Sequence, residues 1–207
     1  MLRTGKKGIR ALGIAESFRK EVGSRAVLAG VVMRSDLLVD GITLTYCTVG
    51  GMDSTDALIS MWNSLRREDI NIVFLGGSVI SWFNIVDLPR LHQAINTPLV
   101  CITYRESRGL RDVLMTRFPE DWETRLRVHE GNGERVEAVL RTGYRLYVRC
   151  FGVGLEDAVK ALDRFTLSGR YPEPVRVAKL IARSALNYLQ PLVDHGAGAG
   201  DVGGETV

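Results

Sequence analysis

The sequence has little cysteine. Its three cysteines, Cys47, Cys101 and Cys150, are odd in number and far apart. A disulfide framework needs pairs and a structural zinc site needs closely spaced ligands, so this pattern favours neither. Each cysteine lies in an apolar, strand-like stretch. We therefore expect buried, reduced thiols and a cytoplasmic location.

Long hydrophobic runs are also missing, because no stretch approaches the roughly 20 apolar residues of a membrane-spanning helix. The basic first residues lead into a candidate strand instead of the apolar core of a signal peptide. We therefore expect no membrane partner. Histidine is scarce, and His92 and His129 have no carboxylate or cysteine at ligand spacing, so the sequence supports neither a histidine-based mechanism nor a zinc site.

A strong charge of either sign is lacking too. The 27 basic and 24 acidic residues give a formal charge of +3, and the pI is about 8.9. With 45% hydrophobic and 25% charged residues, the 207-residue chain has the composition of an ordinary globular protein with one substantial core. A mildly basic balance is compatible with nucleic acid as a partner but does not require it.

The most informative stretch of the chain is residues 69–105. Residues 70–75 and 99–103 are short apolar runs without polar alternation, which predicts two central parallel strands covered on both faces. Between them, glycines at 76–77 interrupt the apolar run, and residues 84–95 show helical spacing. In an open α/β sheet, ligands bind beyond the carboxyl ends of the strands, so these ends are predicted to frame the site.

The rest of the chain completes one α/β layout. Strand patterns occupy residues 9–15, 26–33, 42–49, 137–140 and 144–153, and helix patterns occupy residues 56–67, 110–118, 121–128, 155–165 and 174–189. Three antiparallel strands followed by βαβ crossovers are the layout of the ribonuclease-H-like fold, and a plain doubly wound sheet is the alternative. We expect one domain over residues 1–193 and a flexible glycine-rich tail over 194–207.

Four segments carry a resemblance to a known family: GIRALGIAESF (8–18), VDGITLTYCTVGGMDSTDAL (39–58), FLGGSVISWFNIVDLPRL (74–91) and YPEPVRVAKLIARSAL (171–186). Along nearly the whole chain, the sequence resembles the mainly archaeal endonuclease dU family, which is named for its likeness to endonuclease V. The resemblance implies an α/β, ribonuclease-H-like mixed sheet flanked by helices. It also implies Mg²⁺- or Mn²⁺-dependent cleavage of nucleic acid, DNA before RNA, next to a deaminated or foreign base.

Several acidic residues that the resemblance leads us to expect are missing. Endonuclease V-like enzymes have an aspartate at the end of the first strand, where this chain has Ala15 followed by Glu16. Gly76 stands where the aspartate of the fourth strand is expected, and Gly50 stands in place of the first aspartate of a D-G-x-D pattern. Alanine and glycine side chains cannot bind a metal ion.

Three carboxylates remain as candidate ligands, because Mg²⁺ prefers hard oxygen donors held in place by the fold. Glu16 and Asp53 are candidate catalytic and metal-binding residues, and Asp56 is a further candidate ligand. Glu16 replaces Ala15 only if the strand has ended or bulged, since neighbouring residues in a strand point to opposite faces. Asp53 is also a suitable N-cap for the following helix.

Candidate substrate-binding residues follow the two central strands. Gly76 and Gly77 allow a tight turn whose backbone amides could hold an anion. Asn84 is predicted to cap a helix beside the crevice, where it can also bond a ligand. Arg105 and Arg108 follow the next strand, where they would meet a phosphate, although a solvated pair of surface arginines is equally consistent with the pattern.

Two functions therefore fit the sequence. The first is an endonuclease V-like, metal-dependent nuclease of damaged or deaminated nucleic acid, in which Glu16 and Asp53 hold the ion and Arg105 meets the phosphate. The second is a non-catalytic ribonuclease-H-like protein that binds nucleic acid or a protein partner through the same crevice, which the absent aspartates favour.

Overall fold

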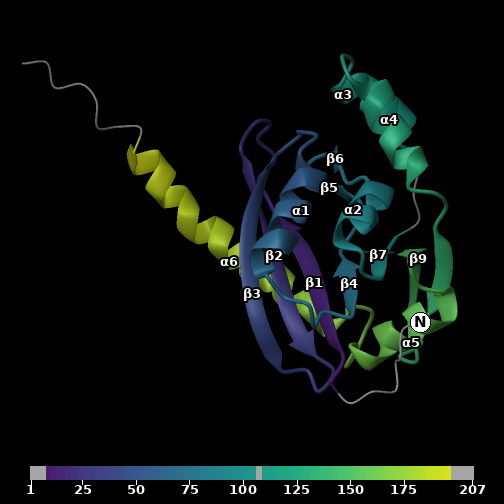
Figure 1. Cartoon of the computed structure of the whole chain (residues 1–207). Helices are drawn as coiled ribbons and strands as arrows, with labels where there is room; N and C mark the ends of the chain where they lie inside the picture. Colours follow the sequence, from purple (N-terminus) through teal and green to yellow (C-terminus); the bar gives the residue numbers. More distant parts are fainter. Residues whose placement is uncertain (1–7, 106–108, 197–207) are drawn as a thin grey trace, which may run out of the picture.

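The computed structural model describes residues 8–105 and 109–196, without the side chains of residues 190–196. Over these ranges the chain forms a seven-stranded mixed sheet in the order β3-β2-β1-β4-β7-β9-β8, with a separate hairpin, β5-β6 (Figure 1). The first three strands are antiparallel, β1, β4 and β7 are parallel, and β9 and β8 return antiparallel. The predicted ribonuclease-H-like mixed sheet is confirmed.

The elements follow the predicted order, except that the hairpin β5-β6 was not predicted. The strands are β1 (Arg10–Ser17), β2 (Arg25–Arg34), β3 (Val39–Thr48), β4 (Ile72–Leu75), β5 (Val79–Ile80), β6 (Asn84–Ile85), β7 (Leu99–Thr103), β8 (Val136–Val139) and β9 (Arg145–Phe151). The helices are α1 (Ser54–Leu65), α2 (Leu88–Ile95), α3 (Arg111–Arg117), α4 (Trp122–Gly131), α5 (Leu155–Arg164) and α6 (Glu173–Gly196).

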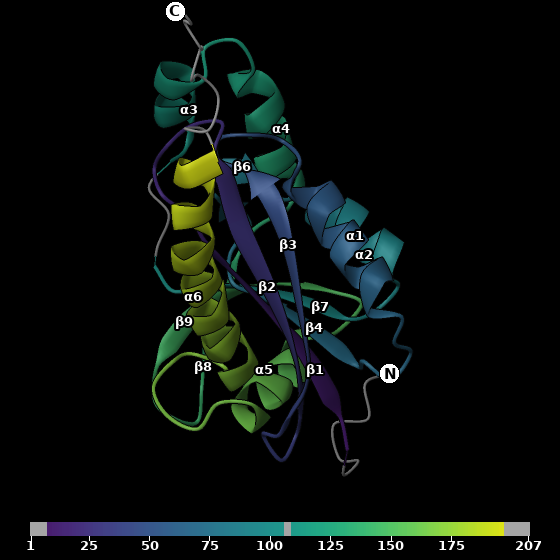
Figure 2. The ribbon, with the colours of Figure 1, turned by 90° about the vertical axis from the view of Figure 1, so that its left-hand side faces the viewer.

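The helices cover the sheet on both faces. Helices α1 and α2 lie on one face, here called the α1 face, and α5 and α6 lie on the other, called the α6 face (Figure 2). Each face has its own buried apolar cluster, one with side chains from α5 and α6 and one with side chains from α1 and α2. β4 and β7 contribute to both clusters, which explains why their sequences are apolar throughout.

Strand β1 is the centre of this arrangement. Its side chains alternate in direction, so that Ala11 and Ala15 pack in the cluster of the α6 face, whereas Leu12 and Ile14 pack in the cluster of the α1 face. Gly13 lies between the two alanines, and a Cβ atom built there would be 2.2 Å from the carbonyl carbon of Pro174. The small residues of β1 therefore allow the backbone of α6 to lie directly against the strand.

Most element boundaries differ from the sequence prediction by one to three residues, and two differ by more. The helix predicted for residues 84–95 begins only at Leu88, because Asn84 belongs to β6 and Asp87 is the N-cap, accepting a hydrogen bond from the Arg90 amide. Asn84 therefore does not cap this helix. Helix α6 continues to Gly196, past the predicted end at residue 189. Of the predicted tail, residues 197–207 lie outside the described part of the chain.

Among the described helices, none is both long and apolar enough to cross a membrane.

The contact between β1 and α6 can be tested with Gly13→Ala. Because the added methyl group would collide with backbone atoms of Pro174, which cannot rotate away, we expect the free energy of unfolding to fall by about 1–3 kcal/mol or more. Gly131→Ala is the matched control, since a Cβ atom at the end of α4 meets nothing within 4 Å. It should be neutral or slightly stabilising in urea denaturation. Equal stabilities of the two variants would contradict the close contact.

Candidate functional site

A left-handed turn joins β5 to β6 beyond the carboxyl end of β4. Its residues Ser81, Trp82 and Phe83 have φ angles of 44°, 60° and 63°, which are unfavourable for residues with a side chain. Glu16 stabilises this turn, because its Oε2 atom accepts hydrogen bonds from the Ser81 amide at 2.5 Å and from the Ser81 hydroxyl at 2.6 Å. The Ser81 carbonyl in turn accepts a hydrogen bond from the Gly50 amide at 2.8 Å.

Two ionisable groups meet at Ser81. Burial raises the pKa of Glu16, and the hydrogen bonds from Ser81 and the charge of Lys179 offset this only in part. The Cys47 thiol donates to Ser81 Oγ at 3.2 Å. Burial, together with the negative charges of Asp53 and Glu16, raises the pKa of Cys47 to about 11 despite this hydrogen bond. The thiol is therefore protonated at neutral pH and is a weak nucleophile there.

Asp53 occupies the N-cap position of α1 but does not cap it with its carboxylate. Its oxygens accept hydrogen bonds from the Thr48 amide at 3.0 and 3.1 Å, from the Thr48 hydroxyl at 2.8 Å and from Asn84 Nδ2 at 2.6 Å. Asn84 Oδ1 instead accepts from the Ser54 amide in the first turn of α1. Burial alone would raise the pKa of Asp53, but these hydrogen bonds hold it below its ordinary value.

Arg125 of α4 connects the loop after β3 to the left-handed turn. Its guanidinium is buried and donates to the carbonyls of Gly50 at 2.8 Å, Gly51 at 2.9 Å and Phe83 at 2.8 Å. It also forms an ion pair with Asp121 at 2.7 Å. The positive charge is therefore compensated within the protein, and this arginine stabilises the loops around the site.

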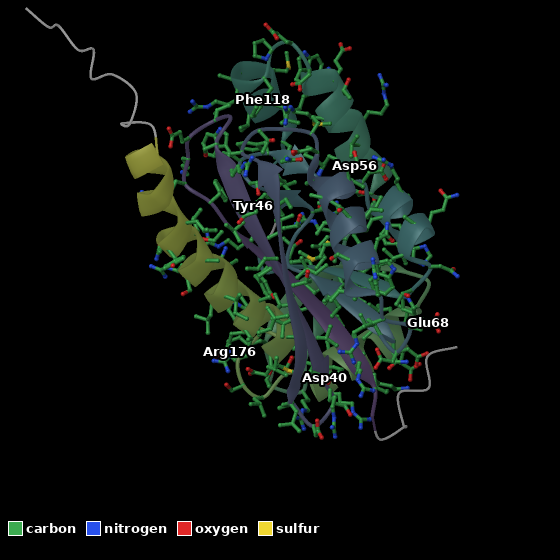
Figure 3. All side chains as sticks on the ribbon, turned by 60° about the vertical axis from the view of Figure 1, so that its left-hand side comes forward. Asp40, Tyr46, Asp56, Glu68, Phe118 and Arg176 are labelled. Atoms are coloured by element: carbon green, nitrogen blue, oxygen red, sulfur yellow. The ribbon has the colours of Figure 1, made fainter. Side chains whose placement is uncertain are left out.

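The remaining carboxylate and the arginines predicted from the sequence lie apart from this network. Asp56 is on the exposed side of α1, at the outside of the molecule (Figure 3), and pairs with Arg90 of α2 at 2.5 Å. Arg105 is exposed just beyond β7, and its carbonyl accepts a hydrogen bond from Arg135 at 3.2 Å. Arg108 lies outside the described residues.

The glycine turn after β4 uses its own backbone amides. The Gly76 amide donates to the Ile14 carbonyl at 3.0 Å, and the Gly77 amide donates to the Leu75 carbonyl at 2.9 Å. Gly77 has a φ of 103°, so a residue without a side chain is required there. Because both amides are bonded within the protein, neither is free to hold an anion.

Two of the three positions where an aspartate is expected, 15 and 76, face α6. At the third, a Cβ atom built on Gly50 would instead lie 3.2 Å from Val22. Ala15 packs in the cluster of the α6 face, and a Cβ atom built at Gly76 would lie 3.3 Å from Val175 of α6. At this end of β1, the Lys179 ammonium donates to the main-chain carbonyl of Glu16 at 2.6 Å. Pairing of β1 with β2 continues regularly through Ser17, so the Glu16 side chain points away from α6. The condition under which Glu16 could replace an aspartate at position 15 is not met.

These contacts do not fit a Mg²⁺ or Mn²⁺ site. On the α6 face, Ala15 and Gly76 offer no ligand atoms, and the Lys179 ammonium lies beside them. On the α1 face, the oxygens of Asp53 and one oxygen of Glu16 already accept hydrogen bonds from the protein. Within residues 8–105 and 109–189, no three His, Cys, Asp or Glu side chains are grouped so that they could hold a metal ion.

Sequence reasoning missed three buried polar residues, Arg125, Asn132 and Arg149. Asn132 accepts from the Leu88 amide at 2.7 Å and donates to the Val86 carbonyl at 2.8 Å, and so stabilises the start of α2. The sequence around Arg125 and Asn132 is polar and gives no signal of burial. Arg149 does have a signal, because it interrupts an apolar strand, but the prediction treated that strand only as a sheet element.

The fold defines the class of protein. A mixed sheet in this order, with helices on both faces, is ribonuclease-H-like. The chain is similar to human endonuclease V with a TM-score of 0.61 and 19% identity, over 88% of this chain and 86% of that chain. It is also similar to Ciona intestinalis endonuclease V, solved with inosine-containing DNA, with a TM-score of 0.58 and 16% identity, over 88% and 87%. At these identities the likeness shows the fold alone.

The sequence then gives the family. The endonuclease dU profile matches residues 7–186, so the chain belongs to the endonuclease dU family. A UPF0215 protein of Pyrobaculum calidifontis is 34% identical over 86% of this chain and 97% of its own length. The crystal structure of an Archaeoglobus fulgidus protein of unknown function is 30% identical, with a TM-score of 0.71 over 86% of this chain and 98% of that one. The family expected from the four sequence segments is confirmed.

The structural role of Asp53 predicts a pH-dependent effect of Asp53→Ala. Removing the carboxylate leaves the Thr48 and Asn84 donors unpaired, so the free energy of unfolding at pH 7 should fall by about 1–3 kcal/mol. Because the folded-state pKa of Asp53 is lowered, its contribution is complete above the unfolded pKa of about 4 and is lost as the pH falls through the folded pKa.

Asp56→Ala is the matched control for Asp53→Ala, since it removes only an exposed ion pair with Arg90 and should cost at most about 1 kcal/mol. Urea denaturation between pH 3 and pH 7 would measure both variants. An Asp53→Ala protein that is as stable as the Asp56→Ala protein at pH 7 would refute the structural role.

Proposed function

We propose that this chain is a nucleic-acid-binding protein of the endonuclease dU family that does not cleave its ligand. One observation carries the proposal: Ala15 and Gly76 stand at the two strand ends that face α6, with the Lys179 ammonium beside them. Metal-assisted cleavage of a phosphodiester needs an ion that stabilises the attacking and leaving oxygens, and carboxylates must hold that ion. Here positions 15 and 76 offer no carboxylate, and the exposed Lys179 ammonium bonds the carbonyl of the next residue, Glu16.

Basic and aromatic side chains beyond the carboxyl end of β4 support nucleic acid as the ligand. The Lys20 ammonium is 5.0 Å from the centre of the Trp82 ring, and the Arg117 guanidinium is 5.9 Å from it. Arg105 is exposed beyond the neighbouring strand β7. Cations on such a surface meet phosphates, and aromatic rings stack on bases. The Ciona endonuclease V solved with DNA supports the same class of ligand on this fold.

The alternative is a metal-dependent nuclease of damaged or deaminated nucleic acid that uses Glu16 and Asp53. One observation favours it, namely that both carboxylates bond next to Cys47: Glu16 accepts from Ser81, which Cys47 also contacts, and Asp53 accepts from the adjacent Thr48. This alternative predicts cleavage of strands containing inosine or uracil in Mg²⁺ or Mn²⁺, and loss of that cleavage in Glu16→Ala and Asp53→Ala.

Binding and cleavage assays on one set of oligonucleotides separate the two functions. We expect saturable binding to DNA or RNA that weakens with salt, because phosphate contacts release counterions, and no product with Mg²⁺ or Mn²⁺. Arg105→Ala should weaken binding, whereas a chelator should not change it. Lys160→Ala is the control, because Lys160 lies on α5, at the opposite end of the molecule from α3 and α4 (Figure 1). Metal-dependent cleavage by the wild-type protein would overturn the proposal.

A variant with carboxylates at positions 15 and 76 tests whether side chains at these two positions can hold a metal ion below α6. In the triple variant Ala15→Asp, Gly76→Asp, Lys179→Ala, two carboxylates should lie side by side below α6. A Cβ atom at position 76 comes to 3.2 Å from the Ile14 carbonyl, so a small local shift is required. Mn²⁺ at about 100 times its Kd should raise the melting temperature by roughly 5 °C or more. Wild type and Lys179→Ala alone should show no shift. A folded triple variant that ignores Mn²⁺ would contradict the assignment.

A further inference from the structure

Arg149 on β9 is a buried cation with incomplete compensation. Only 7% of the residue is exposed; its Nε donates to the Gly133 carbonyl at 2.7 Å, and its Nη1 lies 3.4 Å from Ser78 Oγ. No carboxylate of the described residues forms an ion pair with it. Burial lowers the pKa of Arg149, and the neighbouring Arg135 lowers it further. A buried charge without a counter-ion is unfavourable, so an anion here would stabilise the guanidinium.

Arg125 is a second buried arginine, and its charge is fully compensated within the protein. It is as buried as Arg149, but it has the Asp121 carboxylate and three main-chain carbonyls around its guanidinium. Its hydrogen-bonding capacity is used within the fold. The difference between the two arginines indicates that Arg149 is positioned for an anionic partner that residues 8–105 and 109–189 do not supply.

A cavity of about 500 Å³ opens at Arg149 between β9 and the end of α4. Half-buried Arg135, Tyr147 and His129 line it together with Arg149, and the guanidinium of Arg135 is 5.6 Å from the centre of the Tyr147 ring. His129 Nδ1 is buried and has no hydrogen-bond partner. Burial and the two arginines lower the pKa of His129, so at neutral pH its ring is uncharged and can still donate or accept a hydrogen bond.

The charged residues of this cavity differ in burial. Arg149 is buried and Arg135 half-buried, whereas Glu130 and Glu134, which also line it, are exposed. A guanidinium presents a planar set of donors that matches the oxygens of a phosphate, and an aromatic ring beside it offers a face for a base. The volume lies within the range of about 300–1,000 Å³ that is typical of small-ligand sites. The residues that line the cavity therefore suit the phosphate group of a nucleotide.

We propose that this cavity binds the phosphate group of a nucleotide, with Arg149 and Arg135 as its donors. The proposal rests on the proposed function for the source of that nucleotide and adds the subsite to it. Ser78, next to Arg149, directly follows the glycine turn of β4, so a nucleotide bound here lies at the edge of the predicted crevice. A free nucleotide and the phosphate of a strand share this chemistry.

The test compares ligands that differ in phosphate and variants that differ in the two arginines. Adenosine monophosphate, adenosine and inorganic phosphate are titrated into the full chain by calorimetry, followed by one oligonucleotide with either a 5′-phosphate or a 5′-hydroxyl group. Arg149→Met removes the buried donor and Arg135→Met the half-buried one, so that the second variant keeps the test open if the first does not fold. Arg145→Met is the control, because this residue of β9 has a 74% exposed side chain and pairs only with Glu137.

We expect adenosine monophosphate to bind, adenosine not to bind, and inorganic phosphate to compete. Each pocket variant should weaken binding by about tenfold or more, since hydrogen bonds to a charged group are lost, while Arg145→Met should change it less than twofold. Preference for the 5′-phosphorylated strand would show that the cavity binds the end of a strand. Equal binding of both strands would show that it binds an internal phosphate. Binding of the mononucleotide alone would show that its ligand is a free nucleotide.

Absence of phosphate-dependent binding would overturn the assignment of this cavity as a phosphate site. Equal binding by wild type and folded Arg135→Met would overturn it as well. Oligonucleotide binding that is unchanged in both pocket variants would overturn it too, and would leave the proposed function standing. If the protein bound the mononucleotide but no oligonucleotide, the phosphate site would be confirmed and the proposed binding of nucleic acid would be wrong.

Discussion

The close approach of α6 to β1 is the constraint on which the rest of the structure depends. β1 is hydrogen-bonded to β2 on one side and to β4 on the other, and its α6 face consists of small residues because the first turn of the helix lies directly on it. Any side chain at position 15, or at position 76 of the adjacent strand, is therefore directed under the helix. The same contact places the Lys179 ammonium at the end of β1.

On the opposite face of the sheet, polar side chains stabilise loops. The turn at Ser81, Trp82 and Phe83 is intrinsically unfavourable, and it forms because Glu16 and Arg125 bind its backbone from two sides. Asp53 stabilises the loop after β3 in the same manner, through Thr48 and Asn84. Carboxylates that look like ligands in the sequence therefore act as hydrogen-bond acceptors, which is why their presence says little about a metal ion.

The sequence predicted the strands and the sheet better than the site. Residues 72–75 and 99–103 were recognisable because strands buried on both faces must be apolar, a local property. Asn84 was misplaced because helical spacing in residues 85–95 does not show where a short hairpin such as β5-β6 ends. The roles of Arg125 and Arg149 depend on carbonyls 16 to 75 residues away in the chain, which no local pattern encodes.

The fold is stable without acidic ligands at positions 15 and 76, because nothing else in this contact requires them. Neighbouring carboxylates under α6 would repel each other and lose hydration, so a protein that has them is stabilised when a cation binds. With Ala15 and Gly76 in their place there is no such repulsion, and Ala15 adds apolar contacts to the core of the α6 face. The exposed Lys179 ammonium donates to the carbonyl at the end of β1 and remains accessible to water, so it needs no buried counter-ion. Loss of the ligands therefore removes a requirement for metal from the fold, while the basic and aromatic groups beyond β4 and β7 are untouched.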